Sequence, residues 1–327
     1  MSEIGRRLEN VDMIRKRVLE KINELDLSET TKKEMSKSFK TRLNSFSTSI
    51  IFFTKPFTPV SVTGTECELN CKHCEKIYLK HMLDGSHGKL ITIAQNLAVR
   101  GHRGILLSGG SKTDGSVPSY EVSDEIRQIK DDTHLQISAH TGIVTEEQAK
   151  QLSPWLNMAL VDCIGSDATI SGILGLPNTV DDYDRTLRFL TENGVPIAPH
   201  IIVGLNHGKL DGEFIAIDMV KKYNPNVVVI VVFIPTKGTN CADAPRPLVE
   251  DVAKVIIRAR QEMPDIPLSL SCVRPGGRYR SRLDECAILC GIDRIAVPSR
   301  SAYNLCKDVG LKIHEVDKYC CSYEVIV

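Results

Sequence analysis

The segment Asn226-Val-Val-Val-Ile-Val-Val-Phe-Ile-Pro235 indicates the fold class of this sequence. Its apolar residues form a continuous run and do not alternate with polar ones, as is typical of a strand buried on both faces of a parallel sheet. The run is far shorter than the roughly 18 apolar residues that a membrane-spanning helix needs. It therefore predicts an α/β protein in which helices cover a parallel sheet.

The same pattern, a short apolar run followed by a helical stretch, occurs eight times along the chain. The other seven runs span residues 60–64, 104–110, 134–140, 157–165, 196–205, 267–275 and 291–299. Stretches between them, such as 179–194 and 247–263, have apolar residues at helical spacing. Eight alternating units indicate a (β/α)8 TIM-type barrel more than an open sheet, and such barrels carry their chemistry at the carboxyl ends of the strands.

Segments on both sides of the eight units complete the expected domain organisation. Residues 10–26 have apolar residues at helical spacing, and Ser28 is a typical N-cap of a second helix. We expect residues 1–55 to form an N-terminal helical extension, residues 56–310 the barrel, and residues 311–327 a C-terminal tail. Because the tail contains apolar residues, it is expected to dock on the barrel and close one of its mouths.

Composition and charge narrow the class of function. The 327 residues carry 41 basic and 41 acidic side chains, so the formal net charge is zero, whereas non-specific binders of nucleic acids or membrane surfaces need a basic excess. No apolar run is long enough for a membrane span, and the charged N-terminus has no apolar signal core, so we expect a cytoplasmic protein without nucleic-acid or membrane partners. The 11 cysteines then indicate metal ligation or reactive thiols and not disulfides.

Three of these cysteines follow the run 60–64, in Cys67-Glu-Leu-Asn-Cys71-Lys-His-Cys74. Three thiolates so close together can hold three corners of a four-iron cluster and leave the fourth iron open to a small molecule. Two alternatives stay open at this point. His73 could complete a four-ligand zinc site with the three thiols, or the cysteines could form a surface cluster by coincidence.

The C-x3-C-x2-C spacing after the first strand of a β/α barrel resembles the radical S-adenosylmethionine (SAM) enzymes. This resemblance implies that Cys67, Cys71 and Cys74 bind a [4Fe–4S] cluster whose open iron is chelated by SAM. Reductive cleavage of SAM would then give methionine and a 5′-deoxyadenosyl radical that abstracts hydrogen from an unactivated carbon. His73 departs from the family pattern, in which many members have an aromatic residue near the adenine at this position.

Further matches to this superfamily follow the later runs. Leu106-Leu-Ser-Gly-Gly-Ser111 resembles the Gly-Gly-Glu motif, which implies that the backbone at Gly109 and Gly110 receives the methionine amino group of SAM. Asp162 occupies the position at which biotin-synthase-like members bind the ribose hydroxyls, and residues 202–205 match their adenine-contacting segment. Each match has a simpler alternative: a bare turn at the glycines, a capping or ion-paired aspartate, and core packing.

The remaining cysteines include a second candidate group. Cys320 and Cys321 are adjacent in the tail, and Cys272 lies near the end of the seventh run, at the mouth that the tail is expected to close. We expect these three thiols, with Ser322 as a further candidate, to hold a second iron–sulfur cluster. The alternative is a set of reduced thiols without metal. Cys286 and Cys290 share one helix face, but helix packing explains them more simply.

The tail sequence also resembles a narrower group of enzymes. Cys320-Cys-Ser-Tyr323 is similar to the Arg-Ser-Ser-Tyr end of bacterial lipoyl synthase, and residues 60–327 most resemble the archaeal two-protein lipoyl synthases. A biotin synthase is not expected, because Ala198 stands where that family has a cluster cysteine. The resemblance implies sulfur insertion into an octanoyl chain on a carrier protein or peptide, with a paralogous radical SAM partner and an electron donor such as ferredoxin. The second cluster would donate the sulfur.

Two histidines and two other functions complete the predictions. His140 and His200 belong to runs whose carboxyl ends face the barrel mouth, so they are candidates for contact with substrate or SAM, and a buried structural role is the alternative. One other function is that of a biotin-synthase-like mutase, lyase or cofactor-maturation factor that forms no C–S bond. The other is a non-catalytic metal-binding scaffold.

Overall fold

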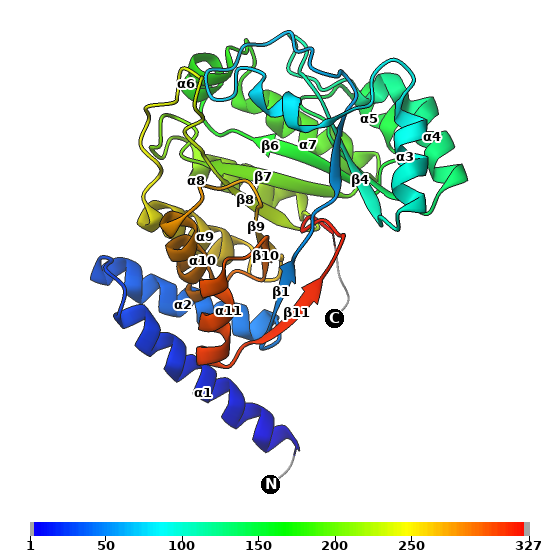
Figure 1. Cartoon of the computed structure of the whole chain (residues 1–327). Helices are drawn as coiled ribbons and strands as arrows, with labels where there is room; N and C mark the ends of the chain where they lie inside the picture. The colour runs from blue at the N-terminus through cyan, green and yellow to red at the C-terminus, as the bar shows by residue number, and fades with distance from the viewer. Residues whose placement is uncertain (1–2, 324–327) are drawn as a thin grey trace.

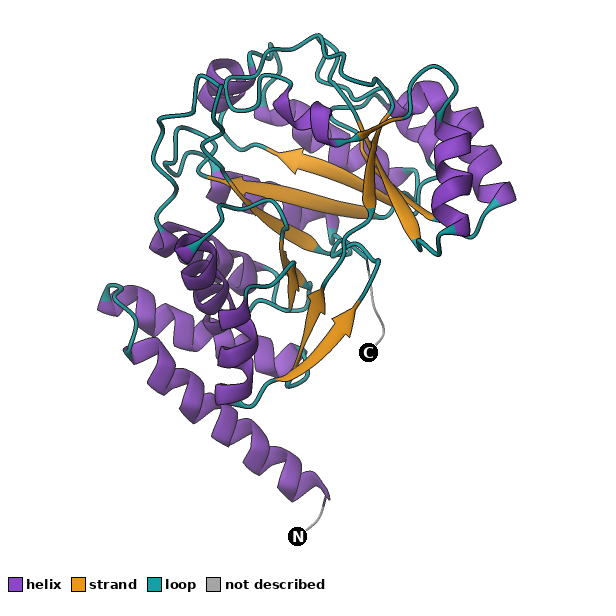
Figure 2. Ribbon diagram, viewed as in Figure 1, coloured by secondary structure: helices purple, strands orange, loops and turns teal. Residues whose placement is uncertain are grey.

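The chain folds around one curled parallel sheet with helices along its outer side, in a computed structural model that describes residues 3–323 (Figure 1, Figure 2). The strands are β1 (Ser49–Phe53), β2 (Thr58–Ser61), β3 (Leu83–Asp84), β4 (Gly104–Ser108), β5 (Gln136–His140), β6 (Met158–Cys163), β7 (Ile197–Val203), β8 (Val228–Val232), β9 (Leu268–Leu270), β10 (Arg294–Ala296) and β11 (Lys312–Val316). The α-helices are α1 (Glu3–Asn23), α2 (Glu29–Ser45), α3 (Leu90–Val99), α4 (Ser123–Asp132), α5 (Glu146–Leu152), α6 (Asp167–Thr169), α7 (Val180–Glu192), α8 (Glu213–Val220), α9 (Val249–Glu262), α10 (Arg278–Leu289) and α11 (Arg300–Val309). Short 3-10 or π segments are η1 (Ile77–His81), η2 (Ser119–Val122), η3 (Ile170–Leu174) and η4 (Lys221–Tyr223).

The α/β barrel class predicted from the apolar runs is confirmed. Each of the eight runs contains one strand, β2 or one of β4 to β10, and the sheet order is β11-β1-β10-β9-β8-β7-β6-β5-β4-β2-β3. No pairing within residues 3–323 joins β3 to β11, so the sheet curls into a half-barrel. The flanking segments supply β1 and β11, which pair in parallel with each other at one end of the sheet. The domain boundaries at residues 55 and 310 stay a prediction.

Strand β8 shows why the sheet is buried on both sides. All five of its residues are buried. Val228, Ile230 and Val232 belong to the core between the sheet and the helices. Val229 and Val231 belong to a second apolar cluster on the inner face of the curl. The continuous apolar run 226–235 therefore contributes side chains to two cores, because successive side chains of a strand point to opposite faces of the sheet.

The N-terminal helical extension is fixed to the sheet by buried charges. Helices α1 and α2 form a hairpin that packs against α9, α10 and α11, and Ser28 caps α2 by accepting a hydrogen bond from the Thr31 amide at 3.3 Å. The buried Arg42 of α2 pairs through Nε with Asp293 at 3.2 Å. Asp293 also pairs with the buried Arg260 of α9. None of the described helices is long and apolar enough to cross a membrane.

The C-terminal tail, the red segment after β11 in Figure 1, runs from the carboxyl ends of β1 and β10 to the beginnings of other barrel strands. Phe57, directly before β2, packs edge-on against Tyr319 and Tyr323, with ring centroids 5.4 Å apart in each pair. The Lys318 ammonium donates to the Arg100 carbonyl at 3.3 Å, just before β4. The tail therefore bridges from β11 to the beginnings of β2 and β4 and covers the inner apolar cluster.

Candidate functional site

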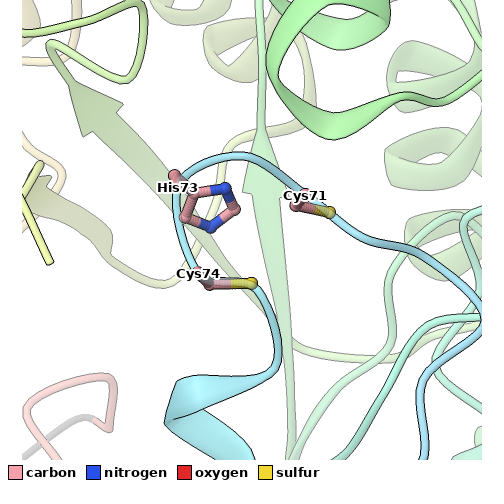
Figure 3. A group of neighbouring side chains, drawn as sticks. All are labelled: Cys71, His73 and Cys74. Atoms are coloured by element: carbon pink, nitrogen blue, oxygen red, sulfur yellow. The ribbon is translucent and has the colours of Figure 1, made fainter. Parts of the chain in front are cut away.

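The loop after β2 brings a histidine and two of the predicted cluster cysteines together. The ligand atoms of Cys71, His73 and Cys74 lie within 4.8 Å of one another (Figure 3), and no other such group of three occurs within residues 3–323. A hydrogen bond from Cys71 lowers the pKa of the Cys74 thiol to about 7, while the same contact and burial raise the pKa of Cys71. Cys74 is therefore the first thiol of this pair to become a thiolate.

The third predicted ligand, Cys67, is held against the end of β4. The Ser111 amide donates to the Cys67 sulfur at 3.3 Å. A Cβ on Gly110 would overlap the Glu66 carbonyl oxygen and lie 2.5 Å from the Cys67 Cα. Glycine is therefore required at position 110 by the close approach of the cysteine loop. The roles of Gly109 and Gly110 in binding SAM stay a prediction.

A threonine ties the cysteine loop to the glycines. The hydroxyl of Thr63 accepts a hydrogen bond from the Gly110 amide at 2.7 Å and donates to the Glu66 carbonyl at 2.8 Å. Thr63 follows β2 by two residues, which places it at the carboxyl end where barrel enzymes carry their chemistry. Thr63 was not predicted from the sequence, although its position at the carboxyl end of an expected strand could have indicated it.

The donor set of the loop fits an iron–sulfur cluster. Three thiols in one loop are the ligands that such clusters prefer, and the peptide N–H that points at Cys67 is the kind of hydrogen bond that tunes a cluster. His73 also has a nitrogen available, because its Nδ1 is buried without a hydrogen-bond partner and burial lowers its pKa to about 4. The neutral imidazole could bind a metal, but the group that assembles lacks Cys67, so the four expected zinc ligands are not brought together in the described chain.

A polar trio lies on the inner face of the half-barrel. The rings of His140 and His200 are 5.2 Å apart, and the His140 Nδ1 is 4.0 Å from the Asp162 carboxylate. Desolvation lowers the pKa of each histidine to about 4 and raises the pKa of Asp162. Both imidazoles are therefore neutral at pH 7, and they act as hydrogen-bonding groups there. The Asp162 side chain keeps 50% of its surface accessible, so it faces open space inside the barrel.

The second predicted cysteine group also assembles in the structure. Cys321 packs with Cys272, Phe53 and Ala296, and the Cys320 sulfur is 3.0 Å from the Ser322 hydroxyl. Hydrogen bonds from Cys321 and Ser322 lower the pKa of Cys320 to about 7. Cys320 and Cys321 are buried, whereas Cys272 is half-buried. The three thiols are neighbours, but in the described chain they do not form a set within 4.8 Å that would suit one ion.

The inner face of the barrel strands carries both the polar trio and residues that pack against the tail. Each residue of the trio follows an inward-facing residue of its own strand by two positions. It therefore lies about 6.6 Å closer to the carboxyl end of that strand. Two of these inward residues, Leu160 and Ala198, pack against the tail through Cys320 and Tyr323. The cysteine loop follows the carboxyl end of β2. The trio residues of β6 and β7 therefore lie between these tail-contacting positions and the carboxyl ends of their strands.

The fold is shared with solved enzymes, although the sequence is not. No protein-family model matches the sequence, and no curated protein matches it. Methylornithine synthase (PylB) matches with a TM-score of 0.64 and 14% identity, over 92% of this chain and 97% of that one. HydG, the FeFe-hydrogenase maturase from Carboxydothermus hydrogenoformans, matches with a TM-score of 0.62 and 16% identity, over 89% of this chain and 71% of that one. At these identities, the likeness shows a shared α/β half-barrel fold.

Within this half-barrel, the loop after β8 covers the cysteine loop. The Glu75 carboxylate accepts a hydrogen bond from the Asn240 amide at 2.7 Å. The Cys241 amide donates to the Lys72 carbonyl at 3.2 Å, and the Tyr78 hydroxyl is 2.7 Å from that of Thr236. These contacts cross more than 150 residues of sequence, and no local pattern marks them. They hold the cysteine loop over the carboxyl ends of the strands.

The other cysteines are accounted for by packing. Cys163, Cys286, Cys290 and Cys306 are buried in the core between sheet and helices. Burial raises the pKa of Cys163 and Cys290 well above the ordinary range, so these thiols stay protonated and inert. The helix-packing alternative for Cys286 and Cys290 agrees with this position.

Proposed function

We propose that this protein is a radical SAM enzyme. The observation that supports the proposal is the position of Cys67, Cys71 and Cys74, three thiols in C-x3-C-x2-C spacing directly after the first barrel strand of the shared half-barrel fold. These residues would hold a [4Fe–4S] cluster. With SAM bound, that cluster supplies a 5′-deoxyadenosyl radical, which removes hydrogen from an unactivated carbon.

The chain's own residues position the reactants. The backbone carbonyls of Gly109 and Gly110, directly after β4, would receive the amino group of SAM. The Asp162 carboxylate faces the interior and can accept hydrogen bonds from two ribose hydroxyls. The neutral imidazoles of His140 and His200 can donate to substrate or nucleoside without adding charge. The tail keeps water out of the opposite mouth, which protects a radical from side reactions.

The test is anaerobic reconstitution with iron and sulfide, followed by reduction in the presence of SAM. We expect about four irons at the cysteine loop, a [4Fe–4S] spectrum that changes when SAM is added, and release of 5′-deoxyadenosine. A Cys71→Ala chain should lose all three. A zinc-filled site, or a cluster with no response to SAM, would contradict the proposal and favour the metal-binding scaffold.

The finer proposal is sulfur insertion, as in the lipoyl synthases. It is supported by the packing of Cys272 against the cluster that contains Cys321, and by the position of Cys320 on the inner apolar cluster. These thiols, with Ser322 beside Cys320, would hold a second iron–sulfur cluster, and such a cluster supplies sulfide next to a carbon radical. The substrate would be an octanoyl chain on a carrier protein or peptide, with a paralogous partner and a ferredoxin-like electron donor in the cytoplasm.

A second candidate function forms no C–S bond. It is favoured by the solved structures that share the fold, which are a methylornithine synthase and a hydrogenase maturase. Iron counting separates the two, since sulfur insertion needs about eight irons per chain and the second candidate needs about four. Mass spectrometry of an octanoyl-lysyl peptide after incubation with SAM and dithionite, with and without a paralogous partner, then tests the substrate.

A further inference from the structure

A buried arginine organises the backbone next to Cys272. The Arg274 guanidinium pairs with Asp284 through Nε at 2.8 Å and Nη2 at 3.2 Å, and neither side chain is exposed. Its other donors reach the carbonyls of Ser271, Ala296 (2.8 Å) and Val297 (3.1 Å). One side chain thus fixes the carboxyl ends of β9 and β10, which lie on either side of Cys272 and Cys321.

The same place holds a strained residue. Val297 has a φ of +48°, a left-handed conformation that is strained and an outlier for a β-branched side chain. Its amide donates to the Phe53 carbonyl at 2.7 Å, and its carbonyl accepts from Arg274. Phe53 packs directly against Cys321. Strain of this kind persists only where the surroundings enforce it, which is typical of functional sites.

A second arginine holds Cys272 itself. The Arg280 Nη2 of α10 donates to the Cys272 carbonyl at 3.2 Å and to the Arg274 carbonyl at 2.9 Å. The Arg280 Nε is buried and has no hydrogen-bond partner. Two guanidinium groups therefore lie beside Cys272, one of the three neighbouring thiol residues. A cluster ligated by thiolates carries negative charge, so cations beside it are favourable.

We propose that Arg274 and Arg280 form a clamp that positions Cys272 for an anionic iron–sulfur cluster shared with Cys320 and Cys321. This inference rests on the proposed sulfur-insertion function. Arg280 is a positioning residue in this clamp, because it acts on Cys272 through the backbone carbonyl. Arg274 is the frame that keeps both strand ends in place.

The test uses Arg280→Gln, because Arg280 is only half-buried and its replacement leaves the Arg274 frame intact. Arg282→Gln on the same helix is the matched control, since Arg282 is exposed. In reconstituted full-length chains, an iron chelator should remove the second cluster from Arg280→Gln about 10-fold to 100-fold faster than from the wild type. Arg282→Gln should behave as the wild type, and Arg280→Lys should recover part of the effect.

Two readouts keep the outcomes distinct. The catalytic cluster and SAM cleavage should be unchanged in Arg280→Gln, and its melting temperature should stay near that of the wild type. If the wild type binds about eight irons and Arg280→Gln releases them at the wild-type rate, the clamp is wrong and sulfur insertion stands. If the wild type binds only the irons of the cysteine loop, and Cys272→Ala changes nothing, the second cluster and the clamp both fail.

Discussion

The cysteine loop places three thiols and one imidazole in a few residues, and two of the thiols ionise differently. Cys74 has a pKa of about 7, and Cys71 has a raised pKa, because the two share a hydrogen bond. His73 is neutral because burial lowers its pKa to about 4. The loop can therefore present soft sulfur ligands at neutral pH with a neutral imidazole beside them, which suits an iron–sulfur cluster.

Replacement of His73 separates the two metals that the loop could hold. We expect His73→Phe to keep its [4Fe–4S] cluster and its 5′-deoxyadenosine release within a few-fold of the wild type, because three thiolates suffice for the cluster. Iron and zinc analysis after anaerobic purification is the measurement. Loss of metal from His73→Phe, together with zinc in the wild type, would identify the imidazole as a ligand.

Gly110 and Gly109 form a matched pair for a steric test. A Cβ at position 110 would overlap the Glu66 carbonyl, whereas a Cβ at position 109 would lie 3.1 Å from the Thr63 hydroxyl, a tight but tolerable distance. We expect Gly110→Ala to lower the free energy of unfolding by about 1–3 kcal/mol and to reduce iron occupancy, with a smaller effect for Gly109→Ala. Urea unfolding and iron analysis measure both. Equal effects at the two positions would contradict the geometry.

Among the elements, the loops after β6 and β7 are joined by one carboxylate. Asp211 accepts hydrogen bonds from Thr169 at 2.6 Å, Ser166 at 2.8 Å and Asn206 at 3.1 Å. The backbones of Gly165 and Gly212 meet so closely that neither position has room for a Cβ. These loops follow Asp162 and the predicted adenine-contacting segment 202–205, so Asp211 holds together the loops at the carboxyl ends of β6 and β7.

Asp211 also gives a pH-dependent contribution to stability. Hydrogen bonds from Thr169 and Ser166 lower the pKa of its carboxyl in the folded chain. Its stabilisation is therefore present above the unfolded pKa of about 3.9 and is lost as the pH falls through the lower folded pKa. We expect Asp211→Asn to lower the free energy of unfolding by about 1–2 kcal/mol at pH 7 and by less near pH 3. Asp243→Asn in the next loop, where Asp243 is exposed, should change little at either pH.

The strands that could be predicted from the sequence are those that serve two cores. Runs such as 226–235 are apolar at every position because both faces are buried, and each of the eight runs proved to contain a strand. Strand β11 was not predicted, since its residues Lys312, His314 and Glu315 are exposed or half-buried at the edge of the sheet. Strand β3 has only two residues and leaves no pattern.

The same reasoning explains which parts of the site could be predicted. Cys67, Cys71 and Cys74 are close in sequence, so their spacing alone carried the prediction. Thr63 and Arg280 were not predicted, because their roles depend on backbone atoms that the fold brings close to them. An open half-barrel was likewise not foreseen, since the count of eight units says nothing about whether the first and last strands meet.

In the whole molecule, the tail has two separable roles. It forms the floor of the half-barrel, meaning the cover over the inner apolar cluster, and it contributes the thiols of Cys320 and Cys321. Removing residues 317–327 would expose the inner apolar residues Met158, Leu160 and Val229 to water. We expect the free energy of unfolding to fall by about 3 kcal/mol or more, because the tail buries two aromatic rings against Phe57.

The full-length Cys320→Ser/Cys321→Ser chain keeps the floor and lacks the thiols, so it is the control for that truncation. It should retain near-normal stability and SAM cleavage but form no thiolated product. The truncated chain should release 5′-deoxyadenosine with or without substrate at similar rates, because water reaches the interior and the radical is no longer protected. Urea unfolding and the ratio of 5′-deoxyadenosine to product distinguish the two chains. If the double serine chain were as unstable as the truncated one, the thiols themselves would be needed to cover the inner apolar cluster, and the two roles of the tail would not be separable.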